Sequence, residues 1–173
     1  MSAARASHDV ALSVGSNLGR REERVLRSIA LLERLDGFEL GAVSSLYETE
    51  PVGIATDFPF INAACTARTS LGPGELLEAC AAIERSLGRQ PSFEPRDRPI
   101  DIDLLLYDDA VIDEPGLSVP HPRMRSRLFV LVPLEEIAPA LVVPPDGRSV
   151  RALREACRPG AWVRVASSRC RVG

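Results

Sequence analysis

The spacing of apolar and polar residues predicts alternating strands and helices along the first two thirds of the chain. Short apolar or alternating runs bounded by glycine, proline or aspartate predict strands. Apolar residues at helical spacing predict two amphipathic helices, each followed by a glycine at which a helix can end. The strands are expected at residues 9–14, 40–47, 61–69 and 100–107, and the helices at residues 25–35 and 73–87.

The last third of the pattern is less regular. A strongly apolar run predicts a helix at 128–137, and the segment 139–147 is expected to be irregular. Two stretches carry proline and glycine without periodicity, so they are expected to be long loops, which in compact domains are usually functional. These loops cover residues 48–59 and 89–99. The smaller elements are a turn at 108–109 into a hairpin strand at 111–112, a loop that closes at 119–122, a short helix at 150–157 and a last strand at 161–165.

The order strand, helix, strand, strand, helix, strand forms two split β-α-β units. Such units most simply build an α+β, ferredoxin-like sandwich, in which an antiparallel sheet carries helices on one face and the C-terminal segments are peripheral additions. A length of 173 residues suits one domain. We expect a disordered lead-in at residues 1–8, a single domain at 9–166 and a tail at 167–173.

The composition argues against several classes of protein. Apolar residues make up 45% and charged residues 26% of the chain, as in ordinary soluble proteins. No apolar stretch approaches the roughly 20 residues of a membrane span, and no apolar segment follows Arg5 as in a signal peptide. The net charge of -3 argues against a nucleic-acid surface, and four scattered cysteines predict neither disulfides nor zinc. We expect a cytoplasmic protein without a membrane or nucleic-acid partner.

Two carboxylates stand on one face of the strand expected at 100–107. Asp101 and Asp103 point the same way, about 6.6 Å apart at Cα, because side chains alternate and a strand rises roughly 3.3 Å per residue. The alternate positions are apolar and are expected to face a core: Ile100, Ile102, Leu104 and Leu106. Carboxylates at this spacing can bridge hard cations, as phosphoryl chemistry requires. A structural salt bridge between these aspartates and arginines is the alternative.

Positive charge is concentrated on both sides of this strand. Guanidinium groups match phosphate oxygens two at a time, so arginines beside a carboxylate metal site predict a ligand with several phosphates and bound magnesium. Loop arginines that neutralise the acidic strand are the alternative. His121, held between two prolines, either donates to a phosphate oxygen or bonds a backbone carbonyl. The cluster comprises Arg89, Arg96, Arg98, His121, Arg123, Arg125 and Arg127.

Aromatic residues are scarce, and two of them flank the charged segments. Phe60 ends the first long loop, and Phe129 follows the arginine run. Flat rings near a charged site can enclose a flat heterocycle, and Asn62 offers paired donor and acceptor groups. Packing in the core is the alternative, above all for Phe129 in its apolar run. These three residues are therefore candidates for binding a heterocyclic ligand.

Six motifs in this order resemble those of the 6-hydroxymethyl-7,8-dihydropterin pyrophosphokinase family. The likeness runs from about residue 10 to residue 165, and the combination is far more specific than any one motif. The motifs are GSNLG at 15–19, YETEPVG at 47–53, FINAA at 60–64, LGR at 87–89, RPIDID at 98–103 and VPHPRM at 119–124. The resemblance implies Mg-dependent attack by the pterin hydroxymethyl oxygen on the β-phosphorus of ATP, giving AMP and the pterin diphosphate in folate biosynthesis.

The resemblance also implies roles for individual residues. The expected catalytic residues are Asp101, Asp103, Arg89 and Arg98, and the two aspartates are the expected ligands of two Mg²⁺ ions. The residues expected to bind ATP are Glu84, Arg89, Arg98, His121, Arg125 and Arg127. The residues expected to bind the pterin are Thr49, Val52, Phe60, Asn62 and Phe129. Both long loops are expected to close over ATP, although Pro91 stands where the family often carries another arginine.

Two other classes of function stay open. A binding module that has lost catalysis would bind ATP and the pterin without releasing AMP. A different two-metal phosphotransferase on the same fold would consume ATP without the pterin. Neither class gives Phe60, Asn62 and the His121 segment a joint purpose. We expect a monomer whose partners are ATP and 6-hydroxymethyl-7,8-dihydropterin.

Overall fold

The computed structural model describes residues 6–90, 97–158 and 160–167. The expected lead-in and tail fall largely outside these ranges, so the domain boundaries stay a prediction. Within the described ranges, no helix is both long and apolar enough to cross a membrane.

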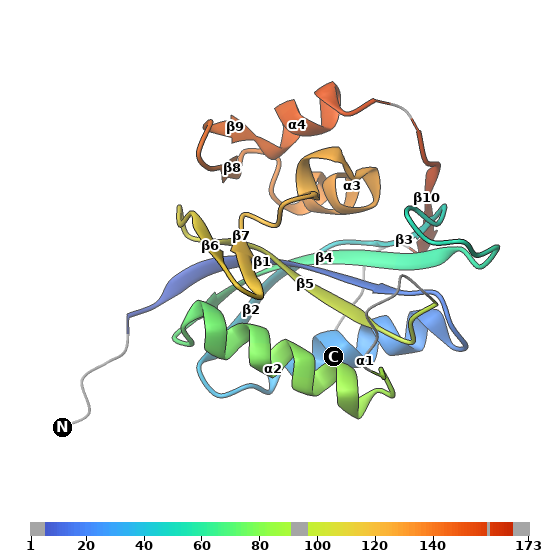
Figure 1. Ribbon diagram of the computed structural model, residues 1–173, viewed down its shortest axis with the longest axis horizontal. Coiled ribbons are helices and arrows are strands. Elements are labelled where there is room, and N and C mark those ends of the chain that lie inside the picture. The colour runs from blue at the N-terminus through green and yellow to red at the C-terminus, as the bar shows by residue number, and fades with distance from the viewer. Residues whose placement is uncertain (1–5, 91–96, 159, 168–173) are drawn as a thin grey trace.

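One antiparallel sheet of six strands forms the centre of the molecule (Figure 1). The strands follow the order β10-β3-β4-β1-β5, and β2 pairs with the rest of β4 beside β3. This arrangement of split β-α-β units confirms the predicted ferredoxin-like fold. The strands are β1 (His8–Ser16), β2 (Phe38–Val43), β3 (Leu46–Thr49), β4 (Phe60–Thr69), β5 (Asp101–Tyr107) and β10 (Val163–Ser167).

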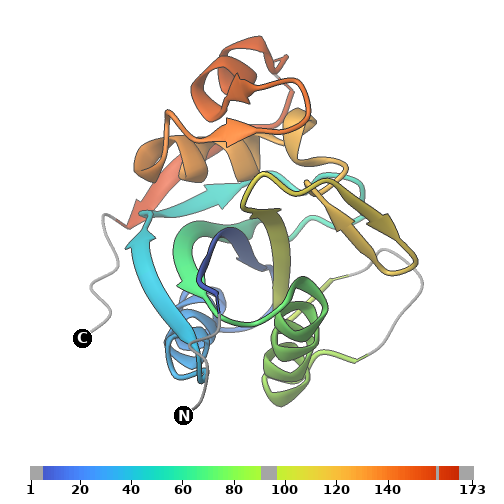
Figure 2. The same cartoon turned by 90° about the vertical axis from the view of Figure 1, so that its left-hand side faces the viewer.

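Helices cover both faces of the sheet (Figure 2). On one face, α1 (Arg21–Glu33) and α2 (Pro73–Ser86) pack as expected. On the other face lies α3 (Leu128–Ile137), with α4 (Val150–Ala156) stacked on it. The two helices of the split β-α-β units thus share one face as predicted, and the C-terminal additions, α3 and α4, cover the other face. The helix α3 buries Val130, Leu131 and Leu134 in a second core, because its apolar run needs a partner surface.

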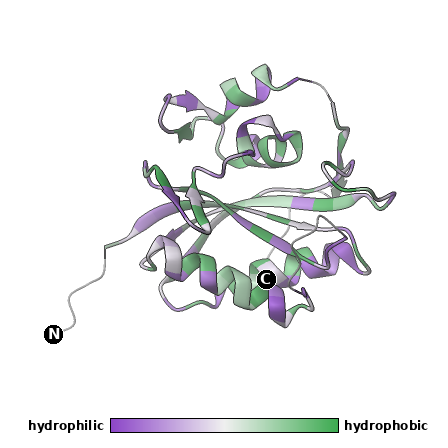
Figure 3. Cartoon of the chain, viewed as in Figure 1, coloured by the Kyte–Doolittle hydropathy of each residue, from purple (hydrophilic) through white to green (hydrophobic). Residues whose placement is uncertain are grey.

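The amphipathic spacing of the sequence explains the first core. In α1, Val25, Ile29 and Leu32 are fully buried against the sheet, as predicted. Hydrophobic residues also run along β4 and α3, whereas α1 carries hydrophilic residues on its outer side (Figure 3). Pro73 occupies the first turn of α2, and the Gly72 N–H donates to Glu75 Oε2 at 2.7 Å, which caps the helix start.

The single strand expected at 40–47 is two strands, with a break at Ser44 and Ser45. The Ala64 N–H donates to Ser44 Oγ at 2.9 Å, so a side chain replaces a backbone group in the ladder with β4. The chain then resumes as β3, which continues through Thr49. The long loop therefore begins at Glu50, not at Glu48 as predicted.

Strict alternation along β5 ends at a bulge. The register with β1 shifts between Ala11 and Leu12, which leaves Leu105 as an extra residue. Leu106 consequently lies in the second core beside Leu105, not on the face of Ile102 as expected. The bulge lies beyond Asp103, so the two aspartates keep the predicted common face.

Two short hairpins also differ from the sequence expectation. The turn at Asp108 exists, with a left-handed φ of 46°, but the next strand does not pair with β5. Instead β6 (Ile112–Glu114) pairs with β7 (Leu117–Val119). The segment expected to be irregular contains β8 (Val142–Val143), which pairs with β9 (Arg148–Ser149). A short 3-10 helix, η1 (Met124–Ser126), precedes α3.

Candidate active site

Three neighbouring strands bring the polar candidates together at one end of the sheet, on the face that α3 covers. Gly15 on β1 lies opposite Asp101 on β5 and opposite Asn62 on β4. Two residues earlier on β1, Ser13 lies opposite Asp103. The antiparallel register therefore places the acidic pair on one side of β1 and Asn62, the residue predicted to bind the pterin, on the other side.

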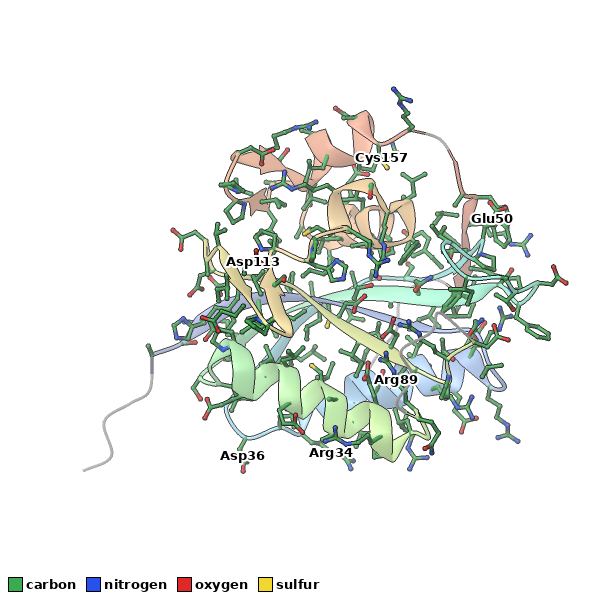
Figure 4. All side chains as sticks on the ribbon, in the orientation of Figure 1. Arg34, Asp36, Glu50, Arg89, Asp113 and Cys157 are labelled. Carbon is green, nitrogen blue, oxygen red and sulfur yellow. The ribbon has the colours of Figure 1, made fainter. Side chains whose placement is uncertain are left out.

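Both oxygens of Asp101 are held by arginines. Arg89 Nη1 donates to Asp101 Oδ1 at 2.6 Å, and Arg98 Nη1 donates to Asp101 Oδ2 at 2.7 Å. Arg89, labelled in Figure 4, also bonds Glu84 of α2. Glu84 in turn accepts the Ile102 N–H at 2.7 Å. Burial raises the pKa of Glu84, and these donors keep its carboxyl satisfied.

Asp103 has no such close partner among the described residues. His121 Nε2 lies 3.9 Å and Arg127 Nη1 lies 4.0 Å from Asp103 Oδ2, which is beyond hydrogen-bond distance. Burial raises the pKa of Asp103 to about 7, and the negative charge of Asp101 acts in the same direction. An underpaired, half-buried carboxylate of this kind is typical of a site that receives a cation or a proton.

His121 presents one nitrogen to the acidic pair. Its Nδ1 accepts the Arg123 N–H at 3.2 Å, so a neutral ring carries its proton on Nε2, the nitrogen that faces Asp103. Burial lowers the pKa of His121 to about 4, and the charges of Arg127 and Arg123 add to this effect. The imidazole is therefore a neutral N–H donor at neutral pH, which suits contact with a phosphate oxygen.

Asn17 fixes the backbone that carries Arg98. The Arg98 N–H donates to Asn17 Oδ1 at 2.7 Å, and the Asn17 N–H donates to the Arg98 carbonyl at 3.2 Å. Asn17 Nδ2 donates to Asp97 Oδ1 at 2.7 Å. A buried side chain in the turn after β1 thus orders the start of β5.

The other end of the site is held by neutral hydrogen bonds and close packing. Asn62 Nδ2 donates to Thr49 Oγ1 at 2.7 Å, which fixes the orientation of a 3% exposed amide. A Cβ on Gly15 would collide with Asn62 Oδ1, so only glycine fits beneath this amide. Arg127 lies over the ring of Phe129, with its Cζ 5.2 Å from the ring centroid.

One cavity joins the charged and the neutral ends. It runs from the aspartates on β5 to the loop after β3, where Glu50 is labelled in Figure 4. The residues that line it are Ser13, Gly15, Thr49, Glu50, Val52, Gly53, Ile54, Phe60, Asn62, Arg98, Asp101, Asp103, Arg123, Arg127 and Phe129. A ligand with a heterocycle at one end and phosphates at the other matches this lining.

Comparison with known proteins identifies the family. The family of 7,8-dihydro-6-hydroxymethylpterin-pyrophosphokinase (HPPK) matches residues 11–139. The chain belongs to this family. The 2-amino-4-hydroxy-6-hydroxymethyldihydropteridine pyrophosphokinase of Pseudomonas aeruginosa is 40% identical over 148 residues, which cover 86% of this chain and 91% of the relative. The Bacillus subtilis enzyme of the same name is 44% identical over 126 residues, covering 73% and 75%.

Solved structures share the HPPK fold at lower sequence identity. Wild-type Plasmodium falciparum HPPK-DHPS with pteroate superposes with a TM-score of 0.71 at 16% identity. The match covers 90% of this chain but 43% of that chain, so this HPPK chain spans less than half of the solved protein's length. The likeness therefore supports the fold alone.

Most residues that the sequence analysis singled out line the HPPK cavity, and four do not. Arg89 contacts the lining residue Asp101, and Glu84 is connected to that residue through Arg89. His121 borders it beside Asp103. Arg125 points elsewhere: its Nη1 lies 2.7 Å from both oxygens of Asp146, and its Nη2 donates to the Pro144 carbonyl at 2.5 Å.

The sequence analysis did not assign roles to several residues of the HPPK site. Gly15 and Asn17 were named only within the GSNLG motif at 15–19, and their contacts with Asn62 and Arg98 are visible only in the fold. Arg123 was counted in the cation cluster without a role. Arg96 of the same cluster lies outside the described residues.

Asp101 and Asp103 are the candidate ligands for a metal ion. No group of three or more histidine, cysteine, aspartate or glutamate side chains in metal-binding geometry occurs in the described ranges. Two carboxylates on one strand face nevertheless fit magnesium, which is usually bound by one or two carboxylates together with water and substrate phosphates.

Proposed function

We infer that this chain transfers the pyrophosphoryl group of ATP to 6-hydroxymethyl-7,8-dihydropterin, giving AMP and the pterin diphosphate in folate biosynthesis. Membership of the HPPK family is the main support for this reaction. The single structural observation that favours it is the continuous cavity that joins Asp101 and Asp103 to Asn62 and Phe129. Such a cavity offers a place for the pterin ring at one end, with its hydroxymethyl group directed at the acidic pair at the other end.

Magnesium is the proposed cofactor, with two ions held by Asp101 and Asp103. When bound beside ATP, magnesium neutralises phosphate charge and favours in-line displacement at phosphorus. Asp103 supports this proposal because, among the described residues, its half-buried carboxyl has no cation within hydrogen-bond distance. Asp101 would need to exchange at least one arginine for a metal ion.

The arginines of the site would then serve the phosphates. Arg89 and Arg98 are held near the cavity by their contacts to Asp101, and their forks can pass from carboxylate to phosphate oxygens at little geometric cost. Arg127 Nη1 and the neutral Nε2–H of His121 lie 4.0 and 3.9 Å from Asp103 Oδ2 and could contact the same phosphates. Positioning and charge compensation dominate phosphoryl transfer, so these groups would supply most of the acceleration.

The neutral end would bind the pterin. Phe60 and Phe129 offer ring faces, and Asn62 keeps one amide oxygen and one N–H beyond its bond to Thr49. The backbone from Thr49 to Val52 adds further donors and acceptors along the cavity wall. A pterin is flat and carries several hydrogen-bonding edges, so this combination suits it.

Four further assignments rest on the sequence and the resemblance. Glu84 would act near the nucleotide by holding Arg89, and Arg125 would bind ATP only after leaving Asp146. An Arg125→Met variant with an unchanged KM for ATP would remove that residue from the site. The monomeric state and the cytoplasmic setting stay predictions, to be tested by light scattering and by cell fractionation.

The test is a product assay with ATP and magnesium, run with and without 6-hydroxymethyl-7,8-dihydropterin. We expect AMP only when the pterin is present, and AMP and pterin diphosphate in equal amounts. Bound pterin without AMP would favour a binding module. ATP consumption that does not depend on the pterin would favour a different phosphotransferase.

A further inference from the structure

The strand β10 lies outside the part of the chain that matches the family. The family match ends at residue 139, and β10 spans Val163–Ser167. This strand pairs antiparallel with β3, with Val163 opposite Thr49 and Arg164 opposite Glu48. It therefore borders the strand that leads into the cavity loop, defined here as residues 50–59.

Glu48 connects β10 to the first helix. Arg164 Nε donates to Glu48 Oε2 at 3.0 Å, and Arg164 Nη2 bonds the same oxygen. On the other carboxyl oxygen, Arg21 Nη2 donates to Glu48 Oε1 at 3.0 Å. Glu48 is well shielded, with a side chain 16% exposed, and the bonds from Arg164 are the largest cause of its lowered pKa. One carboxylate thus joins two arginines from opposite ends of the sequence.

Hydrogen bonds from Trp162 and Arg21 hold the two ends of the cavity loop. At its start, the Glu50 N–H donates to the Trp162 carbonyl at 3.1 Å, and the Trp162 N–H donates to Glu50 Oε2 at 3.2 Å. At its end, Arg21 Nη1 donates to the Pro59 carbonyl at 2.7 Å. Between these anchors, the loop supplies Val52 and Ile54 to the cavity lining.

We propose that Glu48 and Arg164 are positioning residues that set the place of the cavity loop for pterin binding, with β10 as the supporting strand. Neither residue lines the cavity, so each acts through the loop. The proposal rests on the proposed function, because it assigns the loop to the pterin. It predicts that the pterin-binding end depends on a C-terminal strand that the family match does not include.

The charged end of the site, formed by Asp101, Asp103 and their arginines, should keep its geometry when the contacts of Glu48 and Arg164 are changed. Asp101, Asp103 and their arginines are carried by β5, η1 and the segments beside them, on the far side of β4 and β1 from β10. A change in the loop should therefore alter the KM for the pterin and leave the KM for ATP and kcat nearly unchanged. A loss of overall stability would instead lower all activity together.

The test compares Arg164→Met with Arg154→Met. Both arginines belong to the C-terminal segment and pair with a glutamate, but Arg154 pairs with Glu135 at 3.3 Å, away from the loop. For Arg164→Met we expect a pterin KM about fivefold higher, the factor that corresponds to roughly 1 kcal/mol. The KM for ATP and kcat should stay within about twofold. Arg164→Lys, which keeps one cation, should recover part of the affinity.

Hydrogen exchange gives a readout that needs no turnover. Peptides from residues 50–59 should exchange faster in Arg164→Met than in Arg154→Met, so the proposal stays testable even if the chain forms no pterin diphosphate. If Arg164→Met fails to fold, Glu48→Gln against Glu135→Gln makes the same comparison. Equal pterin KM and equal exchange in the matched variants would overturn the proposal.

Discussion

The two ends of the cavity are stabilised in different ways. At the proposed pterin end, Asn62, Thr49 and Gly15 are fixed by neutral hydrogen bonds and tight packing across paired strands. At the proposed phosphate end, Asp101 is paired with two arginines, while Asp103 has no hydrogen-bonded partner in the part of the chain that the structure describes. One end is therefore complete without ligand, and the other is balanced by charges that substrate and metal would redistribute.

This difference fits what each end is proposed to bind. A flat neutral heterocycle is recognised best by preformed donors and acceptors, because ordering them on binding costs affinity. A triphosphate brings several negative charges, so its site must keep arginines in place without ligand. Internal ion pairs with Asp101 and Glu84 achieve this. Substitutions at the two ends should consequently separate catalysis from pterin affinity.

The largest effect is expected at the acidic pair. Asp103→Ala or Asp101→Ala should lower the rate of AMP formation by about a thousandfold, because phosphate charge would no longer be compensated by metal. Pterin affinity and the fold should be largely retained. Asp113→Ala, on the exposed β6, is the control and should behave as wild type. Wild-type turnover in either of the first two variants would contradict the two-metal assignment.

Arg98→Ala should have the next largest effect. We expect kcat to fall by about a hundredfold and the pterin KM to change little, since the guanidinium serves the phosphates and not the heterocycle. Arg85→Ala, which removes an exposed ion pair with Glu78, should leave both parameters unchanged. Steady-state kinetics with each substrate varied in turn makes this measurement. A loss of pterin binding alone would mean that Arg98 belongs to the other end.

Gly15→Ala should affect the pterin end alone. The added Cβ collides with Asn62 Oδ1, so the amide must turn away from Thr49, and pterin affinity should fall by about tenfold. Gly74→Ala is a matched control, because a Cβ there meets no atom within 4 Å. Calorimetric titration with the pterin compares the two. Equal affinities would show that the Asn62 orientation does not matter.

The smallest effect concerns stability and pH. The pKa of Asp103 is about 7 in the folded chain, above the ordinary 3.8, so the folded state disfavours the charged carboxylate. The contribution of Asp103 to the free energy of unfolding should therefore be fully present below about pH 4. It should be lost as the pH rises towards 7. In the presence of a chelator at pH 8, Asp103→Asn should be more stable than wild type by about 1 kcal/mol, after allowance for partial exposure. Denaturant titrations at pH 4 and pH 8 test this, and an equal difference at both values would contradict it.

Much of the sheet and the acidic face could be predicted because they depend on local periodicity. Alternation placed Asp101 and Asp103 together, and helical spacing found the buried face of α1. The failures depend on distant partners. Ser44 breaks a strand only because the Ala64 N–H finds its hydroxyl, and Asn17 gains its role from Arg98, 81 residues later. Periodicity carries no information on such contacts.

The placement of Arg125 illustrates the same limit within the candidate site. The run of cations in the sequence does not indicate that the Arg125 guanidinium pairs with Asp146. Arg98 occupies a similar cluster, yet the backbone bonds of Asn17 hold it at the cavity. Charge clusters in a sequence therefore predict that a phosphate site exists, whereas tertiary contacts decide which arginines belong to it.

The most direct test of the account is phosphorus NMR of the products formed from ATP, magnesium and 6-hydroxymethyl-7,8-dihydropterin. We predict AMP and a pterin diphosphate in equal amounts, since attack falls on the β-phosphorus. Formation of ADP with a pterin monophosphate, or of inorganic phosphate without a modified pterin, would contradict it.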